Sequence, residues 1–135
     1  MKRLFALTIC LSLAALGCSE KLSRTETRMI KEYTKQDKPI EITIGQQFAI
    51  KLVSNPTTGY GWQLSKSLDE KVVSLLTNTY VQKKTDTRMV SVGGHEVWTF
   101  RAVGQGKSEI DMKYVRPWEK DVPAVETNVF SVVVK

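Results

Sequence analysis

The chain has 135 residues, of which 20 are Lys or Arg and 14 are Asp or Glu, and its net charge is +6. This length suits about one domain, and basic residues scattered along a chain are typical of a solvated surface, which argues against nucleic-acid binding. With one histidine and two cysteines, the chain offers little material for a catalytic centre or a metal site.

Residues 1–17 have the pattern of an export signal. Lys2 and Arg3 give a positive start, and an uncharged, mostly apolar run over 4–16 follows. This run has about the length of a signal core and is too short for a membrane-spanning helix. We therefore expect residues 1–17 to be removed, which would lower the net charge from +6 to +4 with the loss of Lys2 and Arg3.

The signal ends in Leu-Ala-Ala-Leu-Gly-Cys, which resembles a bacterial lipobox. Gly17 fits the pattern, whereas Ala15 and Leu16 depart from the usual order of leucine first and small residue second. The pattern predicts a diacylglycerol on the sulfur of Cys18 and acylation, with palmitate, of its new amine. The alternative is an ordinary secretory signal with a chance cysteine.

A lipid on Cys18 would place the protein in the cell envelope, anchored in a membrane. Ser19 follows the cysteine, and the absence of Asp there favours the outer membrane if the cell is Gram-negative. Because Cys10 lies in the removed segment, no thiol would remain for a disulfide, a metal or a nucleophile. Residues 18–38 are polar and charged and are interpreted as the lipidated cysteine and its tether, with a short helix over 27–33 as an alternative.

From residue 39 to residue 135 the sequence predicts strands. Apolar and polar residues alternate as they do in half-buried strands, and Gly-rich or polar turns separate these runs. Expected inward positions include Ile44 with Ile40 and Ile42, and Trp62, the candidate core tryptophan, with Tyr60 and Leu64. The expected strands cover 40–44, 48–53, 60–64, 72–76, 97–103, 107–115 and 129–134, and residues 79–96 are interpreted as a long polar connection. Seven to eight short strands of this kind predict an all-β, immunoglobulin-like antiparallel sandwich.

Three stiff or turn-forming loops lie between these strands, at 54–60, 88–95 and 115–120. The first contains Asn-Pro-Thr-Thr-Gly, in which proline fixes φ and glycine permits a positive φ, so it predicts a rigid tip. The second contains a Gly-Gly pair after exposed apolar candidates, and the third contains Arg-Pro-Trp, with two residue types enriched at binding hot spots. Taken singly, each could be a structural turn. The candidate binding residues are Asn55, Pro56, Thr57, Thr58, Gly59, Met89, Val90, Ser91, Val92, Gly93, Gly94, Arg116, Pro117 and Trp118.

The strings NPTTGYGW, GGHE and YVRPWE resemble, in order and spacing, the three loop motifs of the chagasin-like (ICP-type) inhibitors of papain-family cysteine proteases, here in a bacterial lipoprotein form. The resemblance covers about 40–135. It implies an immunoglobulin-like sandwich and a reversible inhibitor that inserts three loops into the active-site cleft of a clan CA protease. Residues 91–92 depart from the family, whose middle loop is usually richer in glycine.

The resemblance also implies roles for single residues. Thr57 is similar to the tip residue placed at the catalytic cysteine and histidine, with Pro56, Thr58 and Gly59 as its support. Met89 and Val90, with the backbone through 91–94, resemble the loop along the non-primed side. Arg116, Pro117 and Trp118 resemble the loop on the opposite side, where Trp118 would pack on protease aromatics.

An enzyme is not expected. His95 is the only histidine, and no cysteine would remain to pair with it. The sequence shows no metal-ligand cluster and no phosphate-binding loop, so no metal and no cofactor are predicted. The expected protein is a monomeric inhibitor, and the alternative is a non-catalytic envelope lipoprotein that binds a protein or glycan with the same loop edge.

Overall fold

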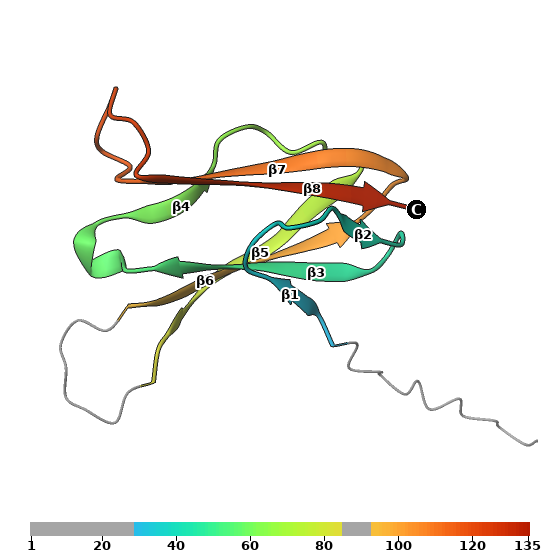
Figure 1. Cartoon of the computed structure of the whole chain (residues 1–135), viewed down its shortest axis with the longest axis horizontal. Coiled ribbons are helices and arrows are strands. Elements are labelled where there is room, and N and C mark those ends of the chain that lie inside the picture. The colour runs from blue at the N-terminus through green and yellow to red at the C-terminus, as the bar shows by residue number, and fades with distance from the viewer. Residues whose placement is uncertain (1–28, 85–92) are drawn as a thin grey trace, which may run out of the picture.

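The computed structural model describes residues 29–84 and 93–135 as two four-stranded sheets packed face to face (Figure 1). The first sheet has the order β1-β3-β6-β5, with β1 (Lys31–Tyr33), β3 (Gln47–Ser54), β6 (Gly94–Ala102) and β5 (Val73–Gln82). The second has the order β2-β8-β7-β4, with β2 (Ile40–Ile42), β8 (Glu126–Val134), β7 (Gly106–Val115) and β4 (Gly61–Leu64). One 3-10 turn, η1 (Pro56–Thr58), connects β3 to β4. The predicted all-β sandwich is confirmed.

Alternating side chains of both sheets form the core, as the sequence predicts. Phe48 and Phe100 are buried and stack with their ring centroids 5.4 Å apart. Met112 and Phe130 are fully buried from the second sheet, and Trp62 is the predicted core tryptophan, with 4% of its surface exposed. These strands therefore place one face in the core, which makes their two-residue period recognisable in the sequence.

The first strand was not expected. Residues 31–33, inside the predicted tether, form β1, which pairs in parallel with β3 and corrects both the tether and the alternative helix at these positions. Tyr33 anchors it, because its ring meets Phe48 edge-on with centroids 6.3 Å apart. A single aromatic anchor in a three-residue strand leaves no periodicity to read. The pairing of β2 with β8 is also parallel, and the other four pairings are antiparallel.

Two further expectations are corrected. The strand at 40–44 ends at Ile42, and Ile44 is 52% exposed in the turn that follows. The connection expected over 79–96 is shorter at both ends, because β5 continues to Gln82 and β6 begins at Gly94. Residues 77–82 are exposed, so neither face of this half of β5 carries an apolar pattern.

The connections divide between the two ends of the sandwich (Figure 1). The η1 turn, the β7–β8 connection and the described ends of β5 and β6 lie at one end, here called the loop end. The turn at 43–46 and the C-terminus lie at the opposite end. Among the described residues there is no helix with the length and apolar character needed to cross a membrane.

Candidate functional site

The tip at residues 55–59 is held by hydrogen bonds within itself. Asn55 has φ −132° and ψ 89°, the extended geometry that a following proline imposes, and its Oδ1 accepts from the backbone N–H of Thr57 at 3.3 Å and from its hydroxyl at 2.6 Å. The hydroxyl of Thr58 donates to the carbonyl of Asn55 at 2.7 Å. Gly59 closes the turn at φ 82°, where its N–H donates to the carbonyl of Pro56. Because these bonds are local, the tip keeps its shape while Pro56, Thr57 and Thr58 remain exposed.

A stack of side chains supports this tip on the side that faces the core. The guanidinium of Arg116 lies 4.4 Å from the ring centroid of Tyr60, which stacks on Tyr114 at 5.4 Å; Tyr114 in turn lies 5.1 Å from Trp62. The hydroxyl of Tyr114 accepts from the backbone N–H of Asn55 at 2.9 Å. The stack thus runs from the exposed edge into the core. Sequence reasoning assigned Tyr60 an inward position on its strand and missed the supporting role of both tyrosines.

The loop after β7 contacts the tip directly. Nε of Arg116 donates to the carbonyl of Thr58 at 3.1 Å, and Nη1 of Arg116 pairs with Oε1 of Glu119 at 3.2 Å. The ring of Trp118 covers Gly59, since a methyl group built on this glycine would lie 2.3 Å from Cη2 of Trp118. Trp118 is nevertheless 66% exposed. The structure therefore brings the first and third predicted loops into one continuous surface.

The described end of the second predicted loop, Gly93, lies beside the base of the tip. A Cβ built on Gly93 would lie 3.3 Å from the carbonyl of Ser54 and 3.6 Å from Cβ of Asn55, so Gly93 lies against the base of the tip. Gly94 is buried instead of exposed; a Cβ there would come within 2.2 Å of the carbonyl of Val81 and 2.8 Å of the hydroxyl of Tyr80. This glycine allows close packing of β6 against β5, and its role in protease contact stays a prediction. Met89, Val90, Ser91 and Val92 lie outside the described residues, as does Cys18.

A buried carboxylate links the bases of these loops. Oε1 of Glu96 accepts from the hydroxyl of Ser54 at 2.7 Å and from the backbone N–H of Trp62 at 3.1 Å, and Oε2 accepts from Nε1 of Trp98 at 3.2 Å. Ser54 precedes the tip, Trp62 follows it, and Glu96 stands three residues after Gly93. The sequence could have indicated that Glu96 points inward, because alternate residues of a strand share a face and Glu96 lies two and four residues before the inward-facing Trp98 and Phe100.

The loop end carries no catalytic machinery among the described residues. His95 is half-buried in β6. Nowhere in residues 29–84 and 93–135 do three or more His, Cys, Asp or Glu side chains converge on a point where a metal ion would fit. What the arrangement offers is a stiff, exposed tip with a tryptophan on one flank, which suits it to contact another protein.

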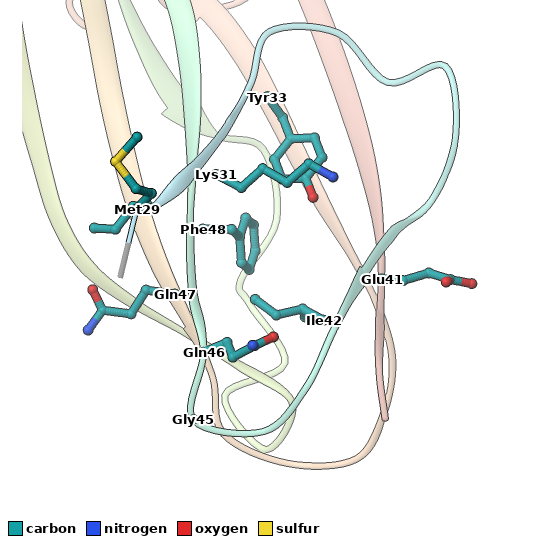
Figure 2. A pocket seen from close by; sticks show the side chains of 10 residues that line it. Met29, Lys31, Tyr33, Glu41, Ile42, Gly45, Gln46, Gln47 and Phe48 are labelled. Carbon is teal, nitrogen blue, oxygen red and sulfur yellow. The ribbon is translucent and has the colours of Figure 1, made fainter. Parts of the chain in front are cut away.

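A pocket lies at the opposite end of the molecule, between β1, β2 and the start of β3 (Figure 2). Phe48, Ile42 and Glu41 are among the residues that line it. Its titratable lining groups are Lys31, Tyr33 and Glu41. Because β3 runs from this pocket to the loop end, the pocket and the three loops are separate features.

Comparison with known proteins gives consistent results. The family model described as chagasin family peptidase inhibitor I42 matches residues 41–134. Chagasin of Trypanosoma cruzi is 26% identical over 99 residues, which cover 71% of this chain and 86% of chagasin. The solution structure of amebosin is similar with a TM-score of 0.64 and 27% identity, covering 78% of this chain and 98% of amebosin. The crystal structure of the cysteine protease inhibitor EhICP2 from Entamoeba histolytica has the same fold, with a TM-score of 0.63, 24% identity, and coverage of 78% and 95%.

Proposed function

The chain belongs to the chagasin family of peptidase inhibitors, and from this we propose that it reversibly inhibits papain-like cysteine proteases by placing its loop end in the active-site cleft. The family consists of peptidase inhibitors, so the prediction that this protein is not an enzyme is confirmed. In this proposal Thr57 lies at the catalytic cysteine and histidine of the protease. Arg116, Pro117 and Trp118 flank it on one side, and the loop that ends at Gly93 flanks it on the other.

The observation that carries the proposal is the rigidity of the exposed tip. A protein that binds a cleft with a preorganised loop loses little conformational entropy on docking. Here Asn55, Thr58 and Gly59 take part in the hydrogen bonds of the turn, and Arg116 ties the turn to the neighbouring loop. The tip therefore enters the complex in the shape that it has in the free protein.

The same hydrogen bonds explain how the tip would resist cleavage. A protease must hold the carbonyl oxygen of the scissile bond in its oxyanion hole and bring the nucleophile to an attack distance. The carbonyl oxygens of Asn55, Pro56 and Thr58 already accept hydrogen bonds from Thr58, Gly59 and Arg116 of this chain. Binding any of these three carbonyls as a substrate would require these bonds to break, which disfavours cleavage at these positions of the tip.

The first test is a titration of papain and of a cathepsin L-type protease with the chain from Ser19 onward, which contains all eight strands. With a fluorogenic peptide substrate, we expect stoichiometric and reversible loss of activity at nanomolar concentrations. A folded protein that leaves both enzymes active at micromolar concentrations would contradict the proposal. It would instead favour an interaction lipoprotein that uses the same edge for a different partner.

The proposal places the inhibitor in the cell envelope as a monomer held by lipid at Cys18. Its support is the order of positive residues, apolar run and cysteine in residues 1–18, together with the mostly polar sequence between Cys18 and β1. In fractionated cells, Cys18→Ser is expected to move the protein from the membrane fraction to the soluble fraction, because the lipid attachment site is lost. Retention of the variant in the membrane fraction would contradict the lipid-anchor proposal and would not bear on the inhibitor proposal.

A further inference from the structure

The outer face of the first sheet changes in chemistry along its length. Residues opposite one another on paired strands share a face, so the register of β3, β6 and β5 defines rows across it. The row farthest from the loops holds Gln47, Arg101 and Ser74, and the row nearest to them holds Val53, His95 and Val81. We call this last row the valine row. The row farthest from the loops is thus polar, whereas the row nearest to them carries two valines on either side of a histidine.

The valine row is exposed. Val53 has 73% of its surface exposed, more than any other large apolar side chain in the strands that the structure describes, and Val81 has 52%. Val97 adds to them in the next row, where it lies between Lys51 and Thr79. A single exposed valine is ordinary in a strand, but two exposed valines on either side of His95, at one end of a face, mark an apolar contact area.

The position of the row connects it to the candidate site. Val53 is two residues before Asn55, and His95 is two residues after Gly93. Gly93 itself lies against Asn55. The valine row therefore lies directly beside the tip and Gly93, with no charged row between them.

We propose that the valine row is a second contact surface for the target protease, which receives an apolar part of the protease surface beside the mouth of the cleft. This rests on the proposed function, because the loops bring the protease to the row. The occupant follows from continuity: a partner that covers Asn55 and Gly93 reaches Val53 and His95 next. A membrane is a poor occupant, because β1 begins at the opposite end of the sandwich, where the chain would leave for its anchor.

The test measures the inhibition constant for papain with the double variant Val53→Ser/Val81→Ser, in the chain from Ser19 onward. Loss of two apolar side chains that the proposed complex buries is expected to raise the inhibition constant roughly 10- to 100-fold. Val129→Ser is the matched control, because Val129 is a strand valine with 46% of its surface exposed on the other sheet. We expect its inhibition constant to stay within about twofold of the wild type.

Three arms separate the outcomes. An unchanged inhibition constant in the double variant, with Thr57→Arg still abolishing inhibition, overturns the second contact surface and leaves the proposed function standing. If wild-type protein self-associates in sedimentation velocity and the double variant does not, with equal inhibition constants, the occupant is a second copy and the proposal is wrong. If the serine variant unfolds, Val53→Thr/Val81→Thr replaces it in the test, because threonine keeps a β-branched side chain in both strands. This variant is also expected to raise the inhibition constant.

Discussion

Replacement of Thr57 by Arg is expected to raise the inhibition constant for papain at least about 100-fold, because the side chain at the centre of an interface carries the largest share of the binding energy. Thr57 is exposed on η1, and its hydroxyl is bonded to Oδ1 of Asn55 at 2.6 Å. An arginine there is too large for a tip that must approach a thiolate closely, and it removes the bond that shapes the turn. The measurement is the inhibition constant from progress curves with a fluorogenic substrate.

The matched control for this variant is Thr43→Arg. Thr43 is an exposed threonine in the turn at the opposite end of the sandwich, so the change adds the same charge and volume far from the loops. Thermal unfolding should be similar for wild type and both variants, because neither threonine is buried. Full inhibition by folded Thr57→Arg would mean that the tip does not enter the cleft.

Loss of the Glu96 carboxylate is expected to have the largest effect on stability. Glu96→Ala leaves the Ser54 hydroxyl, the Trp62 backbone N–H and the Trp98 indole N–H without their acceptor, and all three residues are buried. A buried donor without a partner costs about 1–3 kcal/mol, so the free energy of unfolding should fall by about 3 kcal/mol or more. Because Ser54 and Trp62 lie on either side of the tip, inhibition should weaken as well.

Two variants check the cause of this loss. Glu96→Gln keeps the shape and one carbonyl acceptor, but it turns an amide N–H toward one of the three donors, so it should fall between the wild type and Glu96→Ala. Glu109→Ala removes an exposed glutamate from β7 and should change the free energy of unfolding by less than about 0.5 kcal/mol. Chemical denaturation measures all three. A Glu96→Ala protein as stable as Glu109→Ala would show that the network does not support the loops.

The core of the sandwich could be predicted wherever a strand buries one face. Ile40 and Ile42 in β2 and Trp62 in β4 are buried, and the alternation of the sequence predicted that these residues point inward. Alternation did not reveal the second half of β5, because residues 77–82 have no buried face and therefore no apolar pattern. Alternation did not reveal β1 either, because this strand has only three residues and is held by long-range pairing with β3.

The loops of the candidate site could be recognised one at a time, because proline and glycine fix their local geometry. The convergence of the loops could not be predicted. It depends on the end of β3 lying beside the start of β6, and on a hydrogen bond from Arg116 to Thr58, 58 residues earlier in the chain. The inward position of Glu96 was missed, because the expected strand began at residue 97 and residues 79–96 were interpreted as a connection. Extending the alternation of Trp98 and Phe100 by two residues would have placed Glu96 inward, where a charged side chain requires buried donors.

The exposure of Trp118 gives the molecule an optical label at its loop end. Trp62 and Trp98 have 4% and 7% of their surfaces exposed, against 66% for Trp118. A soluble collisional quencher such as acrylamide should therefore act on the fluorescence of Trp118 and spare the other two. In the proposed complex that ring would be covered, so shielding from the quencher would report occupancy of the loop end directly, with a protease whose catalytic cysteine has been blocked and no substrate present.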